Sequence, residues 1–267
     1  MIRDFLTEAP YGTALYVCAG IAAFCWVTSV VTRECSWVDR VWSIAPSVYC
    51  LIVAADLDFR SARVNIMTVL VLLWSVRLTA NFAVKGGYWK GGEDYRWAHL
   101  RQKLSPLQFQ LVNVTFVSPG QMMIIWLFTS PIHQAWDRSD QPLGWLDYLA
   151  IALFLAFLAV ESIADAQMWR FQQNKKQQIE AGREVRQPFM NQGLFRFSRH
   201  PNYVGEMAIW VSFYLFAIAA SDRVVHWTGL GFILLILLFQ SSARFTEEIS
   251  SHKYPTYGDY QAAVPMF

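Results

Sequence analysis

Seven apolar runs of membrane-spanning length dominate this chain. Crossing the ~30 Å hydrocarbon core of a bilayer takes roughly 20 residues of helix. Runs near that length lie at 11–32, 41–56, 64–84, 107–130, 143–165, 202–220 and 225–245. The second run is short, and a half-buried segment is the alternative reading there. The runs predict an all-α fold, a polytopic membrane helix bundle of about seven transmembrane helices.

Composition points to the same class. Of 267 residues, 55% are hydrophobic and 16% are charged, which is too apolar for a soluble domain of this size. No linker, repeat or low-complexity tract divides the chain, so residues 1–267 are predicted to form a single domain. Charges at Arg3, Asp4 and Glu8 precede a first run of full spanning length, so no cleavable signal peptide is expected.

Basic residues are distributed unevenly among the loops. Sixteen Lys and Arg residues fall in alternate loops and in the tail after 243, whereas five fall on the opposite side and Arg77 lies inside a span. Since basic loops face the cytoplasm, the N-terminus is predicted outside and the C-terminus in the cytoplasm. The expected location is multi-pass, in a bacterial inner membrane or the endoplasmic reticulum.

Two long loops on the basic side are the unusual parts of the chain, because loops so long and charged are more often functional than spacers. Residues 85–106 contain paired glycines that permit tight turns. The other loop begins as a polar continuation of the fifth helix and is expected to end before Pro188. In the fourth run, Ser118-Pro119-Gly120 predicts a kink or break, which either lines a cavity or serves packing alone.

Ionisable side chains share one depth in the predicted spans. Such groups cost ~3 kcal/mol or more at the bilayer centre and are usually paired or functional. Their common level predicts a polar cavity open to the cytoplasm, with snorkelling and ordinary salt bridges as the alternative. A transporter or receptor would instead distribute polar residues through the midplane. The residues at this level are Asp39, Arg77, Asn81, Glu161, Asp165, Glu206 and Arg244.

The segment LFRFSRHPNYVGE is the sharpest local signal. Pro201 suits the first position of a helix, which leaves amide donors beside Arg199 and His200 in an anion-binding geometry. Asn202 and Glu206 share a helix face and are candidates to hold an amide or a ribose. A helix cap flanked by interfacial arginines is the alternative.

The tail offers further groups on the same side. Tyr254 and Tyr257 are candidates to stack on a base, and Glu247 and Glu248 to accept from ribose hydroxyls, although interfacial tyrosine belts look similar. No Gly-rich Rossmann fingerprint or Walker loop occurs, so a nucleotide would be held by the membrane bundle itself. The four cysteines lack CxxC pairs and histidine partners, so no metal site is expected.

Several segments resemble one family. SRHPNYVGE and a tail that ends YGDYQAAVP look like the C-terminal half of the steroid 5-alpha-reductase superfamily. SWVDRVWSIAP and GGYWKGGEDYRW look like its bacterial and protist branch, so the resemblance covers the chain from about residue 36 to the end. RHPNYxGE belongs to a wider clan, which includes reductases that use NADPH and methyltransferases that use S-adenosylmethionine.

The resemblance implies an NADPH-dependent membrane oxidoreductase that delivers hydride to a carbon-carbon double bond conjugated to a carbonyl in a steroid-like or other lipid substrate. The expected partners are this lipid-like substrate and membrane lipids, and no nucleic acid. An S-adenosylmethionine-dependent methyltransferase of isoprenylcysteine or phospholipid type is the alternative. The candidate cofactor-binding residues are Arg77, Asn81, Glu93, Asp94, Arg96, Asp165, Arg199, His200, Asn202, Tyr203, Glu206, Arg244, Glu247, Glu248 and Tyr257.

The proton donor is where this chain departs from the reductase pattern. The steroid reductases carry a Gln-Glu pair before the second-helix proline, whereas Ser-Ile-Ala precedes Pro46 here, and their third-helix tyrosine falls on Trp74. A replacement acid is needed to polarise the carbonyl oxygen. The replacements within reach are Asp39, Tyr88, Glu93, Asp94 and Tyr95, and of these Asp39, Tyr88 and Tyr95 are the candidates for the catalytic role.

Overall fold

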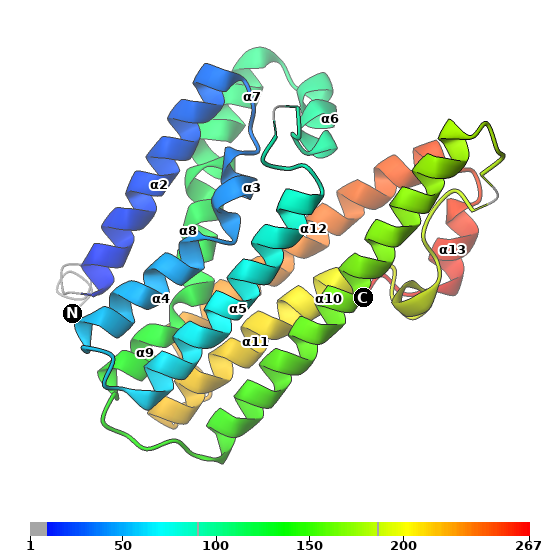
Figure 1. The fold of residues 1–267 in the computed structure, drawn as a ribbon. Helices are drawn as coiled ribbons and strands as arrows, with labels where there is room; N and C mark the ends of the chain where they lie inside the picture. Colours follow the sequence, from blue (N-terminus) through cyan, green and yellow to red (C-terminus); the bar gives the residue numbers. More distant parts are fainter. Residues whose placement is uncertain (1–9, 90, 186) are drawn as a thin grey trace. The chain divides into compact units, whose positions relative to one another are not determined.

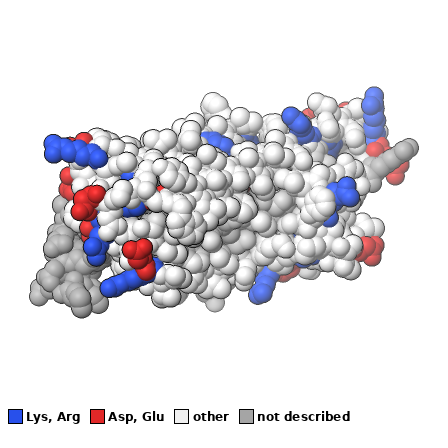
Figure 2. All heavy atoms as spheres, turned by 90° about the horizontal axis from the view of Figure 1, so that it is seen from below, with Lys and Arg blue, Asp and Glu red and all other residues white. Residues whose placement is uncertain are grey.

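The structure is a computed structural model of the chain and describes residues 10–89, 91–185 and 187–267. Every regular element in these ranges is a helix. Within them, seven helical stretches are long and apolar enough to cross a membrane, which confirms the predicted all-α, multi-pass membrane protein. The face drawn in Figure 2 is mostly free of charge, with Lys, Arg, Asp and Glu in small groups. The seven stretches are Tyr11–Thr32, Trp37–Asp56, Ala62–Val84, Pro106–Thr129, Trp145–Glu180, Pro201–Ser221 and Trp227–Lys253.

The second stretch is longer than the sequence predicted. Helix α3 (Trp37–Trp42) is followed closely by α4 (Ala45–Asp56), and the two together reach 20 residues. The backbone continues through the junction, because the N–H of Ile44 donates to the carbonyl of Val41. The predicted start at residue 41 was therefore too late, and this stretch has spanning length like the others.

The fourth stretch is broken as expected. Helix α7 (Pro106–Val112) leads into the π-helix η1 (Asn113–Val117), and α8 (Pro119–Thr129) begins at the proline. The N–H of Ser118 donates to the carbonyl of Asn113, five residues back, at 3.1 Å. Proline lacks the backbone donor that would continue the ladder, so the predicted break is confirmed at Pro119.

The fifth stretch confirms the predicted polar extension. Helix α10 (Trp145–Glu180) is 36 residues long and ends at Glu180, well before Pro188. Helix α11 (Pro201–Ser221) begins at Pro201, as the sequence predicts. The last membrane-length helix, α12 (Leu230–Lys253), follows the short helix η3 (Trp227–Gly229), and α13 (Tyr257–Ala263) lies in the tail.

The chain divides into two compact units. Unit 1 comprises Met1–Ile151 and Ser212–Leu234, and unit 2 comprises Ala152–Val211 and Leu235–Phe267. Helices α10, α11 and α12 each contribute residues to both units. The single domain therefore stays a prediction.

The core of unit 1 combines helices that are neighbours in sequence with helices that are far apart in it. Helix α4 packs against α5 (Ala62–Val84), and α2 (Tyr11–Thr32) packs against α8 (Figure 1). Met67, Trp74 and Ile125 are fully buried among them. Large apolar side chains elsewhere on the same helices stay exposed, such as Val31 at 76%, as expected for surfaces that face lipid.

A buried ion pair joins two helix starts in unit 1. Arg63 at the start of α5 donates from Nε to Oδ1 of Asp147 at 2.7 Å and from Nη2 to Oδ2 at 2.9 Å. The side chains are 2% and 0% exposed. Asp147 also accepts from the N–H of Gly144, at the beginning of α10. Removing either partner would leave a buried charge without compensation.

Replacing Arg63 with alanine should lower the free energy of unfolding by about 3–5 kcal/mol, because Asp147 would then be buried without its partner. Denaturant unfolding of the detergent-solubilised protein, followed by tryptophan fluorescence, measures this. Arg60→Ala is the matched control, since its pair with Asp58 is exposed and such pairs contribute less than about 1 kcal/mol. Equal effects of the two substitutions would contradict the interpretation.

A buried histidine lies near the start of α2. His133 belongs to α9 (Pro131–Asp137) and is 3% exposed. Tyr11 donates its hydroxyl to the carbonyl of His133 at 2.7 Å, and the two rings lie 3.9 Å apart. Burial lowers the pKa of His133 to about 3, so its ring is neutral in the folded protein.

The stability of the protein should therefore depend on pH through His133. A histidine in the unfolded chain has a pKa of about 6.5, so below that pH the unfolded state binds a proton that the buried ring of the folded state does not bind. Stability is complete above that value and is lost as pH falls toward the folded pKa of about 3, by about 1.4 kcal/mol per pH unit. Unfolding curves of the wild type and of His133→Gln, recorded between about pH 4 and 7 so that the range spans the unfolded pKa of about 6.5, would measure this pH dependence. Parallel pH dependences in the two proteins would refute this role.

Candidate functional site

Glu93 is the centre of the first polar cluster, which lies in unit 1. Its Oε1 accepts from the N–H of Cys35 at 2.6 Å, and Arg101 donates to both carboxylate oxygens at 2.6 and 2.7 Å. Burial raises the pKa of Cys35 to about 11, so the thiol keeps its proton at neutral pH. We term the contacts between residues 35–40 and residues 87–101 the loop clasp.

Asp39 and Tyr88 are also bonded within the loop clasp. Asp39 accepts from the indole N–H of Trp97 at 3.0 Å, and the Tyr88 hydroxyl donates to the carbonyl of Arg40 at 2.9 Å. Arg40 is buried and donates to the carbonyl of Gly87 at 3.0 Å. The two predicted proton donors thus hold the long loop against α3, and their catalytic role stays a prediction.

Asp94 and Arg96 are paired with each other. Asp94 caps α6 (Tyr95–Lys103) by accepting from the N–H of Arg96 at 2.9 Å, and it accepts from the Arg96 guanidinium at 2.8 Å. The N–H of Asp94 donates to Ser36. Tyr95, the third predicted proton donor, is 56% exposed. The pairing gives both charged residues a structural role, and their cofactor contacts stay predictions.

Arg77 and Asn81 lie one turn apart on one face of α5, and both are half-buried. Their predicted contact with a cofactor stays a prediction. The loop that follows α5 makes the tight turns expected of its paired glycines, since Gly86 and Gly91 have φ of 86° and 82°.

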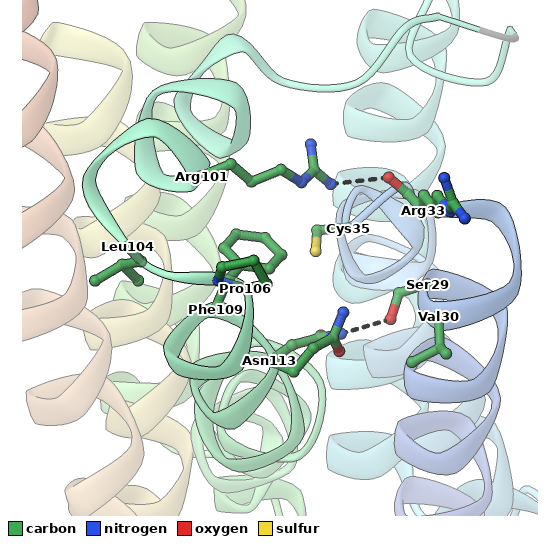
Figure 3. Close-up of a pocket in the computed structure, with 10 residues that line it drawn as sticks. Ser29, Val30, Arg33, Cys35, Arg101, Leu104, Pro106, Phe109 and Asn113 are labelled. Carbon is green, nitrogen blue, oxygen red and sulfur yellow. Dashed lines mark hydrogen bonds between the residues drawn. The ribbon is translucent and has the colours of Figure 1, made fainter.

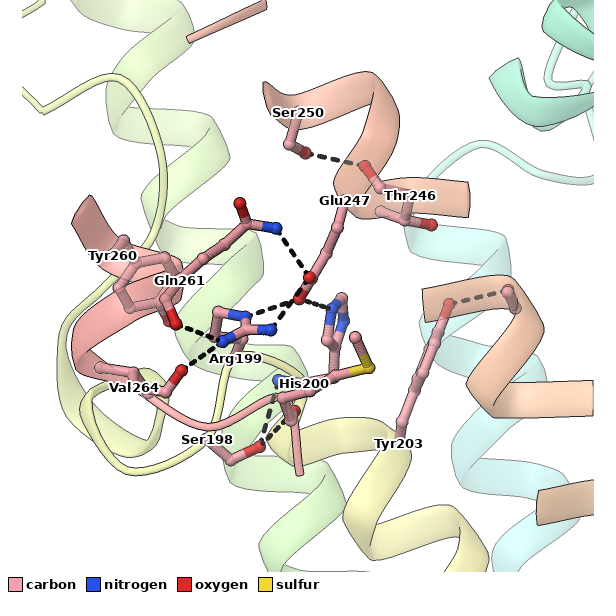
Figure 4. Close-up of polar contacts among 12 residues, drawn as sticks. Ser198, Arg199, His200, Tyr203, Thr246, Glu247, Ser250, Tyr260, Gln261 and Val264 are labelled. Atoms are coloured by element: carbon pink, nitrogen blue, oxygen red, sulfur yellow. Dashed lines mark hydrogen bonds and ion pairs between the residues drawn. The ribbon is translucent and has the colours of Figure 1, made fainter. Parts of the chain in front are cut away.

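The second polar cluster lies in unit 2 and surrounds Glu247 (Figure 4). Arg199 donates to both carboxylate oxygens, at 2.6 and 3.0 Å, and His200 and Gln261 contribute one bond each at 2.9 Å. Four contacts match the acceptor capacity of a carboxylate. Burial, together with the Arg199 charge, lowers the pKa of His200 against the opposing effect of Glu247.

The C-terminal segment runs against the start of α11. The N–H groups of Arg199 and His200 donate to the carbonyls of Pro265 and Met266 at 2.9 and 3.2 Å. The Arg199 guanidinium also donates to the carbonyl of Val264. We term these contacts, with those around Glu247, the tail clasp. Because Arg199 and Glu247 are occupied there, their predicted contacts with a cofactor stay predictions.

Buried carboxylates gather where α10 and α11 cross in unit 2. A Cβ on Gly205 would lie 2.8 Å from Cβ of Glu161, so only glycine permits this approach. Glu161, Asp165 and Glu206 are 4%, 7% and 3% exposed. Glu206 accepts from the indole N–H of Trp210 at 3.0 Å. Three carboxylates are therefore held inside membrane-length helices.

Other predicted residues of unit 2 lie around this crossing and in the tail. Asn202 is half-buried one turn before Glu206, and the Tyr203 ring stacks on His200 with centroids 5.3 Å apart. Arg244 and Glu248 are exposed on α12. In the part of the chain that the structure describes, no group of three or more His, Cys, Asp or Glu side chains is arranged to hold a metal ion.

Tyr257 is packed inside an aromatic cluster of the tail. Its ring lies 5.1 Å from that of Phe189 and 5.7 Å from that of Tyr260, and Tyr257 is 6% exposed. The Tyr260 hydroxyl donates to the carbonyl of Phe195 at 2.5 Å. Tyr257 thus contributes to the packing of the tail, and its stacking on a base stays a prediction.

Comparison with known proteins finds relatives that match most of the chain. The sequence profile of a family described as "Protein of unknown function (DUF1295)" matches residues 25–264. The chain belongs to this DUF1295 family. It is similar to an uncharacterized protein of Schizosaccharomyces pombe, with 36% identity over 260 residues, which is 91% of this chain and 74% of that protein. No solved structure matches. The region matched to DUF1295 contains both the loop clasp and nearly all of the tail clasp.

Sequence reasoning missed the residues that complete each clasp. Arg40 and Arg101 were counted only as loop charges, and Gln261 was not singled out. One signal was available, since Arg40 lies within the tryptophan-rich segment that carried the family resemblance. The partners of these residues are 47, 8 and 14 positions away, so their pairing required the folded chain.

Replacing Arg199 with alanine should release the tail and destabilise unit 2, because Glu247 would lose two of its four contacts. We expect the free energy of unfolding to fall by about 3–5 kcal/mol. Carboxypeptidase digestion of the folded protein should also shorten the variant faster than the wild type. Arg196→Ala is the control, since that side chain is exposed three residues earlier. A protected tail in Arg199→Ala would argue against the clasp.

Proposed function

We propose that this protein is a membrane-embedded NADPH-dependent reductase, which delivers hydride to a carbon-carbon double bond conjugated to a carbonyl in a lipid-like substrate. The proposal places the dinucleotide at the crossing of α10 and α11. It also takes the N-terminus as outside and the C-terminus as cytoplasmic, following the uneven distribution of basic residues.

The observation that carries the proposal is the burial of Glu161, Asp165 and Glu206 at one helix crossing. Ionisable groups inside membrane spans are rare and usually mark a substrate or ion pathway. The tight contact at Gly205 fixes the backbone on which Glu161 and Glu206 stand. A rigid pair of helices is a suitable base for a binding site.

The donors and acceptors near this crossing fit a dinucleotide. Carboxylates of Asp165 and Glu206 suit ribose hydroxyls as acceptors, and the Asn202 amide offers both a donor and an acceptor. Arg244 is exposed on α12 and supplies a guanidinium, the group that recognises phosphate in bidentate fashion. Arg199 is less suited to phosphate, because Glu247 and the tail already take up its donors.

Bound NADPH would supply the hydride, so the residues of the chain need only bind, orient and protonate. Asn202, Tyr203 and Glu206 lie in the first two turns of α11 and would orient the cofactor. The acid that polarises the carbonyl is proposed among Asp39, Tyr88 and Tyr95. Of these three, Tyr95 is the most exposed, at 56% against 37% for Tyr88, while Asp39 is half-buried.

The decisive experiment compares binding of NADPH and S-adenosylmethionine to the detergent-purified protein. We expect saturable NADPH binding, measured by energy transfer from tryptophan to the reduced nicotinamide. Asn202→Ala combined with Glu206→Gln should weaken it at least about tenfold, since a hydrogen bond to a charged group contributes about 1.5–3 kcal/mol. Saturable binding should then be followed by a screen of unsaturated ketones for NADPH consumption.

Glu180→Gln is the matched control, because that carboxylate is exposed at the far end of α10 and pairs only loosely with Lys176. Thermal unfolding of each variant tests whether a loss of binding reflects a loss of fold. Binding of S-adenosylmethionine without NADPH would replace the reductase by a methyltransferase. Binding of neither compound would remove the nucleotide from the proposal.

A further inference from the structure

A cavity of about 500 Å³ lies in unit 1 between the end of α2 and the start of the fourth stretch. Figure 3 shows α2 on one side and the α6–α7 region on the other, with the side chains of Cys35, Phe109 and Asn113 between them. This volume is within the range of small-molecule sites in proteins. None of the lining residues belongs to the site proposed for the dinucleotide.

The end of the cavity beside α6 is basic. Arg33 and Arg101 line it, and no Asp or Glu is among the lining residues. Arg101 is held in place, because its guanidinium donates to Glu93 and to the carbonyl of Arg33 at 2.9 Å (Figure 3). Glu93 compensates the charge of Arg101, whereas no Asp or Glu of the cavity lining compensates that of Arg33. The cavity therefore favours an anionic or strongly hydrogen-bond-accepting group at this end.

The flanks of the cavity are apolar and continue onto exposed helix faces. Val30, Leu104 and Phe109 line it. Beyond it, Leu107 is 81% exposed at the start of α7, and Val31 is 76% exposed at the end of α2. Exposed apolar side chains on membrane-length helices face lipid chains. A ligand with a hydrocarbon tail would thus keep its tail in apolar surroundings along its whole length.

The depth of the cavity matches the headgroup layer of a bilayer. The first membrane-length stretch ends at Thr32 and the fourth begins at Pro106, so both stretches terminate beside the basic end. Toward the middle of the fourth stretch, Asn113 of the π-helix donates to Ser29 at 2.8 Å and closes the cavity floor (Figure 3). Basic pockets between transmembrane helices at this depth suit anionic lipid headgroups.

We propose that this cavity binds one anionic phospholipid from the surrounding membrane. Its phosphate accepts from Arg33, whose charge no carboxylate of the lining compensates, and an acyl chain follows the apolar flank formed by α2 and α7. A free inorganic anion would satisfy Arg33 but would leave the apolar flank uncovered. The lipid accounts for both ends of the cavity, and the site is independent of the proposed reductase activity.

Native mass spectrometry of the delipidated protein tests the proposal. Phosphatidylglycerol and phosphatidylcholine with the same acyl chains are titrated in mixed micelles. We expect one phosphatidylglycerol to bind about tenfold more tightly than phosphatidylcholine. Arg33→Gln should weaken phosphatidylglycerol about fivefold, from about 1 kcal/mol per basic residue near the membrane surface. Val30→Trp, which fills the apolar flank, should abolish stoichiometric binding.

Lys103→Gln is the matched control, since it removes one charge from the same short helix as Arg101 without lining the cavity. Arg101 itself is left intact, because it also supports the loop clasp. Equal binding of the two lipids, or unchanged binding in Arg33→Gln and Val30→Trp, would overturn the proposal. Displacement of the lipid by an equal concentration of glycerol phosphate would also overturn it and indicate a site for a soluble anion.

Discussion

A hydrocarbon core offers no hydrogen-bond partner, and the buried polar contacts of this protein are arranged around that constraint. Most backbone groups are satisfied within helices, and several buried charged side chains are bonded to one another. Arg63 therefore bonds Asp147, and Glu247 collects donors from Arg199, His200 and Gln261. The apolar helix faces need no such pairing, so the specific polar contacts concentrate at helix ends.

The two clasps satisfy polar groups of the long loop after α5 and of the tail after α12. In the loop clasp, backbone and side-chain groups of residues 87–101 are bonded to α3 and its neighbours. In the tail clasp, the last residues of the chain are bonded to the start of α11. Many charged residues of the two clasps, which the sequence suggested as ligand contacts, are thus hydrogen-bonded to other groups of the protein. Asn202 and Glu206 lie outside both clasps, at the crossing of α10 and α11, and are therefore the better candidates for a role in function.

The helices could be predicted from sequence because membrane spans carry their signal locally. Apolar run length placed all seven stretches, and Pro201 marked the start of α11 correctly. The break at Pro119 was visible for the same reason. The early start of the second stretch was missed, since charges at Asp39 and Arg40 interrupt its apolar run although the backbone stays helical.

The pairing of polar residues could not be predicted in this way. Arg199 and Glu247 were each singled out, but only the fold shows that they bind each other across 48 positions of sequence. Asp39 and Trp97 are 58 positions apart. Such contacts depend on how helices are arranged, and hydropathy carries no information about that. The crossing at Gly205 is another example. The sequence does not indicate which helix packs closely against this glycine.

The length of α10 has a consequence for access from water. Its 36 residues extend about 54 Å at 1.5 Å per residue, whereas a hydrocarbon core is about 30 Å thick. The helix is therefore longer than the hydrocarbon core requires by roughly 20 Å. Lys175, near its C-terminal end, bonds Tyr254 of the tail. The tail is thus bonded to the polar end of α10, at a level where a water-soluble compound can approach it without partitioning into the bilayer.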